Sequence, residues 1–504
     1  MNPLLKNKLT ALIVLVLSFA ASMASSSKCS AEIPERPEKL VFADRNFTPP
    51  DPAQYRHVLS SGAVVFIAED HDIPLVDISV TVRTGQYLDP AGKDGLAGLT
   101  GSQMRTGGTT STKAEAFDEE ADFLAASISS GIGDTQGGAS AGCLSKDVDR
   151  VLDLYFDMLR NPAFQQDRLD LAKAQELEGM KRRNDSTTSI EAREWNRLMR
   201  GKEHFSSKMS TSATLGAITR DDLIAFHKKY YHPNRFIFSV AGDFRTDEML
   251  ANIEKHLAGW EAAIEDVPPI PKPDITPKTG LYFVNKDVNQ GRISIGHLGT
   301  TRENPDRYAL LVMNNILGGG GFTSRIMSRV RSDEGLAYSA GSRFDLGVYY
   351  DGVFRAAFQS KSPSCAQAIK IVLDEINKMR TEKVTDSELK TAINAVAESL
   401  PRQFSNARTI VNTFADDEYT HRDPNYWKEF QAGVRGVTAD AVLGASQKYL
   451  HPDSLTMMAV GNVAAIRKGN PDKPDFRVDD YAPGGAINTI PLPDPLTLVY
   501  PITF

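Results

Sequence analysis

Cysteine is scarce in this chain of 504 residues, which contains three in all. Cys29 lies within the first 31 residues, and only Cys143 and Cys365 follow it. If those 31 residues are removed, at most one disulfide is possible. Neither later cysteine lies in a Cys-x-x-Cys or Cys-His array, so we expect both to be buried thiols rather than metal ligands.

Histidine is sparse as well, with nine residues in the chain. His227 and His232 are five residues apart and flank a turn, whereas His297, His421 and His451 are isolated. We interpret each of them as a capping, surface or core histidine rather than a metal ligand.

The chain has no excess of positive charge. Its net charge of -7 and its isoelectric point near 5.8 argue against nucleic acid or an anionic membrane surface as the main partner. Hydrophobic residues make up 41% and charged residues 24%, a composition typical of a globular protein with a large core. The length exceeds that of one ordinary domain.

The N-terminal apolar run, Leu9 to Ala21, is too short to favour a membrane-spanning helix. Two lysines precede it and small residues follow it, which is the pattern of a signal peptide. Cleavage after Ala24 or Ala31 fits the small-residue rule. We therefore expect residues 1–31 to be removed on export to the bacterial periplasm, leaving no stable membrane anchor.

The sequence contains an internal repeat. Residues 219–244 reappear as residues 438–463 at a constant offset of 219 without a gap, and both copies read as a helix, a His-Pro turn and an apolar strand. This indicates a tandem duplication of one domain. The identical pairs are Thr219/Thr438, Asp221/Asp440, Lys229/Lys448, Tyr230/Tyr449, His232/His451, Pro233/Pro452 and Gly242/Gly461.

The repeat divides the chain into two domains of mixed strands and helices. We predict an α+β fold with similar domains at 32–266 and 280–468, each an antiparallel sheet with helices. The segment 267–279 is rich in proline, which favours an extended linker. A proline-rich extension, 469–504, follows the second domain, either packed on the chain or reaching a partner, and we favour packing.

The most distinctive stretch of the second domain runs from Leu317 to Phe344, LGGGGFTSRIMSRVRSDEGLAYSAGSRF. Four glycines allow a tight turn or a close backbone approach, and a short helix with an apolar face follows them. Gly335 ends that helix before a strand. Arg331 and Tyr338, seven residues apart across this turn, have the chemistry to bind a carbonyl or a developing oxyanion. The four glycines are Gly318, Gly319, Gly320 and Gly321.

A plain reading treats the glycines as a loop, Arg331 as a solvated charge and Tyr338 as a half-buried core residue. The glycines form no phosphate loop, because no Gly-Lys-Ser/Thr follows them. The whole string, however, resembles the second-domain signature of the insulinase/pitrilysin family of zinc peptidases, in particular the short bacterial members related to mitochondrial processing peptidase. The resemblance implies a clamshell-half fold, substrate binding at Gly318 to Gly321, and roles for Arg331 and Tyr338 in holding substrate and stabilising the transition state.

The resemblance also locates a zinc site, an inverted His-x-x-Glu-His motif on a helix of the first domain. This chain instead has Gly98 and Ser102 at the two histidine positions and Gly101 at the position of the general base. The third ligand, a glutamate further along, would fall near Glu178. We therefore expect this chain to bind no catalytic zinc.

Three functions remain open. In the first, the chain supplies Arg331 and Tyr338 in trans, as the non-catalytic subunit of a periplasmic zinc peptidase whose partner carries His-x-x-Glu-His and the zinc. In the second, it is a peptide-binding or structural scaffold like the core proteins of the mitochondrial respiratory complex, and in the third it is an autonomous peptidase with atypical ligands. We favour the first function, because a scaffold has no reason to keep Arg331 and Tyr338. We then expect the chain to be inactive alone and the substrate to be an extended peptide.

Overall fold

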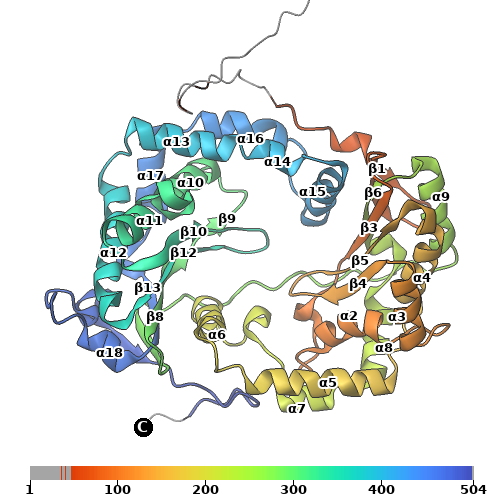
Figure 1. Cartoon of the computed structure of the whole chain (residues 1–504), viewed down its shortest axis with the longest axis horizontal. Helices are drawn as coiled ribbons and strands as arrows, with labels where there is room; N and C mark the ends of the chain where they lie inside the picture. The colour runs from red at the N-terminus through yellow and green to blue at the C-terminus, as the bar shows by residue number, and fades with distance from the viewer. Residues whose placement is uncertain (1–35, 37–39, 41–46, 502–504) are drawn as a thin grey trace, which may run out of the picture. The chain divides into compact units, whose positions relative to one another are not determined.

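Two six-stranded sheets form the framework of the computed structural model, which describes residues 36, 40 and 47–501. The strand order is β1-β2-β6-β3-β5-β4 in the first sheet and β14-β7-β13-β8-β12-β10 in the second (Figure 1). The first sheet consists of β1 (Arg56–Val58), β2 (Val64–Glu69), β3 (Leu75–Val82), β4 (Ser127–Ile132), β5 (Gly137–Leu144) and β6 (Phe236–Gly242). The second consists of β7 (Gly280–Asn285), β8 (Gln290–Leu298), β10 (Ala337–Phe344), β12 (Val353–Lys361), β13 (Thr456–Gly461) and β14 (Ile487–Thr489). Two short strands, β9 (Thr300–Thr301) and β11 (Leu346–Gly347), pair with each other.

Helices alternate with these strands along the chain, in keeping with a mixed fold. The first half, up to residue 266, contains α2 (Leu96–Thr106), α3 (Ala114–Phe123), α4 (Val148–Arg160), α5 (Gln166–Lys181), α6 (Thr187–Arg200), α7 (Ser212–Ala217), α8 (Arg220–Tyr230) and α9 (Thr246–Leu257). The second half, from residue 280, contains α10 (Arg307–Asn314), α11 (Arg325–Met327), α12 (Cys365–Thr381), α13 (Asp386–Ala397), α14 (Leu400–Gln403), α15 (Ala407–Thr420), α16 (Tyr426–Arg435), α17 (Ala439–Tyr449) and α18 (Val463–Lys468). Within the part of the chain that the structure describes, none of the helices combines the length and apolar character that crossing a bilayer requires. The expected signal peptide, residues 1–31, lies outside the described residues.

The two sheets repeat one topology. Strands β2, β6, β3, β5 and β4 of the first sheet occupy the places of β7, β13, β8, β12 and β10 in the second. In both sets the first two strands are parallel and the others pair antiparallel. The turns Pro233–Arg235 and Pro452–Ser454 directly precede β6 and β13, so the two His-Pro turns are equivalent. The α+β fold expected from the repeat is confirmed, whereas the domain limits 32–266 and 280–468 stay a prediction.

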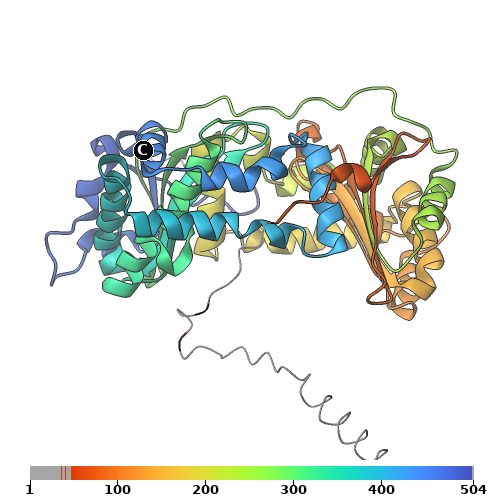
Figure 2. The ribbon, with the colours of Figure 1, turned by 90° about the horizontal axis from the view of Figure 1, so that it is seen from above.

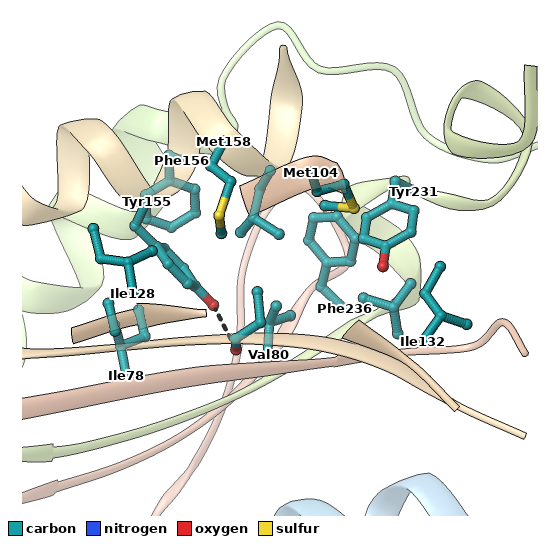
Figure 3. Close-up of a cluster of buried hydrophobic side chains, with 14 of the residues drawn as sticks. Ile78, Val80, Met104, Ile128, Ile132, Tyr155, Phe156, Met158, Tyr231 and Phe236 are labelled. Carbon is teal, nitrogen blue, oxygen red and sulfur yellow. Dashed lines mark hydrogen bonds between the residues drawn. The ribbon is translucent and has the colours of Figure 1, made fainter. Parts of the chain in front are cut away.

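The first core forms where helices cover one face of the first sheet (Figure 3). Alternate residues of β3 from Val76 to Val82 are all buried, because one face of the strand is apolar. Tyr155 and Met158 of α4 are completely buried against this face. The Tyr155 hydroxyl donates to the carbonyl of Ala139 at 3.1 Å, which satisfies the one polar atom of a side chain otherwise suited to the core.

The other face of each sheet is covered by a helix from the opposite half. Helix α15 lies against β2, β3 and β6 of the first sheet, and α6 lies against β8 and β13 of the second (Figure 1). Ile190, Trp195 and Met199 of α6 form an apolar cluster with Met458 and Val460 of β13. This reciprocal exchange joins the chain from residue 49 onward into one compact unit.

The linker and the proline-rich extension add contacts between the halves. Residues 267–279 contain neither helix nor strand (Figure 2). The extension contributes β14, which pairs with β7, and then packs Leu496 against the core of the first half. The Tyr500 hydroxyl donates to the Glu194 carboxylate at 2.8 Å and accepts from Arg197 at 2.8 Å. The extension therefore packs against both halves.

The contact of Tyr500 with Glu194 predicts a measurable contribution to stability. Tyr500→Phe should lower the free energy of unfolding by about 1.5 kcal/mol, the low end for a hydrogen bond to a charged group, because Glu194 keeps Arg193 as a partner. Urea denaturation measures this change. Tyr481→Phe is the control, since the Tyr481 hydroxyl bonds to none of the described residues. Equal unfolding midpoints for the two variants would contradict the prediction.

Candidate functional site

The glycine run lies between α10 and α11, and its conformation follows from close packing on β10. The chain continues from α10 as a π-helical turn, Asn315–Gly319, and then a 3-10 turn, Gly321–Thr323. A Cβ atom on Gly318 would lie 2.3 Å from the backbone nitrogen of Ser342 in β10. Gly321 has a φ of +62°, which disfavours other residues. Gly318 therefore lets the backbone lie close to β10, and the predicted binding of substrate by the four glycines stays a prediction.

A second irregular helix carries Arg331. Helix α11 passes into a π-helical turn, Ser328–Asp333, and Gly335, with a φ of +62°, ends it as expected. Ile326 and Val330 are fully buried, and the segment packs against α12 and β10. π-helical turns are rare and occur often at functional sites.

The Arg331 guanidinium contacts two aromatic rings. Its guanidinium carbon is 4.7 Å from the ring centre of Phe322 and 4.5 Å from that of Tyr338. The Arg331 guanidinium has no hydrogen bond or ion pair with any residue that the structure describes. By contrast, Arg325 forms a bidentate pair with Glu388, and Arg329 bonds Asp333 at 3.1 Å. Arg331 therefore keeps its N–H donors free while the two rings fix its orientation.

Tyr338 lies on a β-bulge of β10. Ala337 pairs with Ser360 and Ala340 with Phe358, so β10 has two residues where β12 has one. A bulge of this kind redirects a side chain, and the Tyr338 side chain is 84% exposed. Its hydroxyl has no hydrogen-bond partner among the described residues. The bulge thus presents a free phenol beside the free guanidinium of Arg331.

Phe322 is the site residue that sequence reasoning missed. It is 65% exposed, which is unusual for a phenylalanine, and its ring contacts the guanidinium of Arg331 as the ring of Tyr338 does. An aromatic residue directly after a glycine run was the available signal. The structure thus adds a third member to the predicted Arg331–Tyr338 pair.

A groove extends from this site over the sheet. Tyr338 lines a hollow of about 670 Å³, and a second hollow of about 580 Å³ shares Arg292, Ser339 and Ala357 with it. We call these two hollows, which overlie one face of β8, β12 and β10, the sheet groove. Three of the predicted glycines, Gly318, Gly319 and Gly321, line its second hollow.

The helix expected to carry the zinc motif is α2, which lies against β4 and α5. Gly98 faces open space, and Ser102 is exposed and donates to the Leu99 carbonyl at 3.1 Å. Gly101 is buried, and a Cβ atom there would lie 2.3 Å from the backbone nitrogen of Ile132. The backbone of α2 thus occupies, against β4, the space that a general base at this position would need.

The remaining zinc-ligand candidate is Glu178 on α5. It is exposed and pairs with Lys181 at 2.5 Å, which lowers the pKa of its carboxyl. Among the described residues, no three His, Cys, Asp or Glu side chains gather closely enough to hold a metal ion. The residues at the expected zinc site therefore do not fit the metal.

Two of the histidines and both of the later cysteines are buried. Burial lowers the pKa of His227 and of His297 to about 4, and each imidazole bonds a backbone carbonyl. Cys143 and Cys365 are free and buried, as expected, and burial raises their pKa to about 11 and about 12.

Comparison with known proteins gives consistent matches. Residues 217–396 match the family model described as the peptidase M16 inactive domain. An uncharacterized zinc protease of Rickettsia bellii is 23% identical over 350 residues, which cover 68% of this chain and 82% of that protein. The probable mitochondrial-processing peptidase subunit beta of Arabidopsis thaliana is 21% identical over 481 residues, which cover 88% of this chain and 87% of that protein.

A solved structure has the same fold. The crystal structure of a peptidase M16 inactive domain from Pseudomonas fluorescens matches with a TM-score of 0.71 at 23% identity, covering 81% of this chain and 97% of that one. The family-model match, the relatives and the duplicated fold agree with the resemblance found in the glycine, arginine and tyrosine signature. The chain is similar to members of the insulinase/pitrilysin, or M16, family of peptidases over most of its length, and its residues 217–396 match the inactive-domain model of that family.

Proposed function

We propose that this chain is the non-catalytic subunit of a heteromeric periplasmic zinc peptidase, and that it supplies Arg331 and Tyr338 to the active site of a homologous partner. The partner would carry His-x-x-Glu-His and the zinc. The observation that supports this most directly is the stacked Arg331, whose N–H donors have no partner among the described residues. A purely structural arginine is normally paired, as Arg325 is.

The chemistry of the pair suits peptide hydrolysis. The Arg331 guanidinium, in contact with the rings of Phe322 and Tyr338, can donate to a substrate carbonyl without losing much side-chain freedom. The Tyr338 phenol can donate to the oxyanion that forms on the scissile carbonyl. Tyr338 lines the sheet groove, and Arg331 lies against the Tyr338 ring. Binding and stabilisation of the reacting carbonyl would thus come from this chain.

The first half of the chain supports a partner that supplies the zinc site. Gly98, Gly101 and Ser102 offer neither imidazole nor carboxylate, and the close contact of α2 with β4 leaves no room for a base at residue 101. The metal and the base must then come from another chain. A relative is itself named as a subunit, the beta subunit of a probable mitochondrial-processing peptidase.

The first prediction under this proposal concerns metal content. The purified chain should hold no stoichiometric zinc and should cleave no peptide by itself, because its residues 98, 101 and 102 lack ligand atoms. Elemental analysis after dialysis measures the metal. About one tightly held zinc per chain would contradict the prediction and would favour an autonomous peptidase.

The second prediction concerns restoring the motif. Gly98→His with Ser102→His should give a folded protein that binds zinc, because residue 98 faces open space, residue 102 is exposed, and imidazoles at i and i+4 share a helix face. Adding Gly101→Glu should cost about 1–3 kcal/mol of stability, because even its Cβ overlaps the backbone of β4. Calorimetry with zinc and urea denaturation measure the two effects. A triple variant as stable as the double variant would contradict the structural argument.

The third prediction concerns the donors. In the complex with the partner, Tyr338→Phe should lower kcat by about 10²–10³-fold, equivalent to roughly 2.7–4 kcal/mol, while assembly is unchanged. Arg331→Ala should also raise KM, because a guanidinium binds the ground-state carbonyl as well. Steady-state kinetics separates the two parameters.

Arg329→Ala is the matched control for the arginine, since Arg329 lies on the same π-helical turn but pairs with Asp333. It should leave kcat and KM close to those of the unmodified complex. If Tyr338→Phe and Arg331→Ala combined also left the rate unchanged, the pair would be structural, and the scaffold function would replace the one proposed here.

A further inference from the structure

The sheet groove is lined mainly by cations, although the chain as a whole is acidic. The strand register places Arg292 of β8, Arg343 of β10, and Arg355 and Lys361 of β12 on one face of the sheet, the face that α6 partly covers. The basic residues in the lining are Arg200, Arg292, Arg343, Arg355 and Lys361, and the acidic residues are Glu334 and Asp345.

Part of this charge has no counter-charge. Arg343 pairs with Asp345 at 2.9 Å, and Glu334 pairs with Lys473 at 3.5 Å. Of the other lining cations, Arg200 and Lys361 form no ion pair within the described part of the chain.

Two further cations share one anion. Arg292 and Arg355 both pair with the carboxylate of Glu191 on α6, which is 2% exposed. One positive charge of this pair is therefore left over, Lys361 adds another, and Arg200 has no ion pair although Asp134 and Asp345 act on it electrostatically. The lining cations thus outnumber the anions of the lining and Glu191.

The fold does not require this charge, as the first half of the chain demonstrates. Asp77 of β3 occupies the place of Arg292 of β8, because it pairs with the corresponding residues of the neighbouring strands. The corresponding face holds Ser79 and Ser140, and its one basic lining residue, Arg408 of α15, pairs with Asp77 at 3.3 Å. The hollow there measures about 230 Å³. The open, basic face is thus particular to the second half.

The spacing of the cations indicates which kind of ligand fits the sheet groove. Arg355 and Lys361 lie on one face of β12 and are six residues apart, which corresponds to about 20 Å along a strand. An extended peptide of about seven residues covers this distance. Its acidic side chains would meet the basic residues at both ends, and Tyr338 would lie at the side of its backbone.

We propose that the sheet groove binds an extended peptide segment that carries acidic side chains about six residues apart. The inference rests on the proposed function, because it assigns a substrate class to the site of Arg331 and Tyr338. Carboxylates would pair with Lys361 at one end and with Arg200 and Arg355 at the other. Acidic segments would be preferred over neutral and basic ones.

Fluorescence polarisation of labelled peptides tests this on the full chain without its partner. The probe is a twelve-residue peptide with two glutamates six positions apart, and its twins carry glutamine or lysine at those positions. The glutamate peptide should bind about tenfold more tightly than the glutamine twin, and the lysine twin should bind most weakly. Raising the salt concentration should reduce the difference. Equal affinity of the three peptides would overturn the proposal.

Substitutions in the sheet groove test where the glutamate peptide binds. Lys361→Gln combined with Arg200→Gln should weaken binding of the glutamate peptide about tenfold and leave the glutamine twin unchanged. Lys361→Arg should keep the affinity. Lys390→Gln, an exposed lysine on α13 outside the groove, is the control and should have no effect.

The outcomes separate this inference from the proposed function. If the groove variant bound the glutamate peptide like the unmodified chain, the inference would fail, and the Tyr338→Phe kinetics would still decide the proposed function. If the variant instead lost only its association with the partner subunit, the groove would be a subunit interface and the inference would be overturned.

Discussion

The buried carboxylate of Glu191 is the charge on which the arrangement of the two halves depends. It lies on a helix of the first half, and its partners Arg292, Ser294 and Arg355 lie on the second sheet. A buried carboxylate is costly unless it is paired and hydrogen-bonded, so this helix cannot leave the sheet without leaving a charge unpaired. The same contact holds two arginines in place beside the sheet groove. One ionic cluster thus fixes both the packing of the halves and the electrostatics of the candidate site.

Glycine has a corresponding role in both halves. Gly101 brings α2 against β4, and Gly318 brings the π-helical turn after α10 against β10, the equivalent strand. In the first half this contact occupies the position of the general base. In the second half it supports the strand whose bulge carries Tyr338. The two halves therefore share a close glycine contact between a helical segment and the equivalent strand. They differ in the side chains that remain near this contact for chemistry.

Much of the fold follows from sequence, because repeats and apolar periodicity are local properties. The gapless offset of 219 places β6 and β13 correctly, and the alternation from Val76 to Val82 identifies the buried face of β3. Periodicity indicates which face of a helix is apolar, but it does not indicate which sheet covers it, so the exchange of α6 and α15 was not predictable. The pairing of Arg331 with Tyr338 could be predicted from the sequence. The contact of Phe322 with Arg331 could not, because it depends on the exact path of the π-helical turn.

The exchange of helices has a consequence for how such a chain arises. A single repeat would expose one face of its sheet and the apolar side of the helix meant for the other half. Two identical copies related by a twofold axis could exchange that helix, so that each exposed sheet face is covered by the apolar side of the other copy's helix. A linker between the copies makes this helix exchange intramolecular, because each copy is then present at a high effective concentration near the other. The duplicated chain can then be described as a homodimer made permanent, whose halves are free to diverge because each one still completes the other.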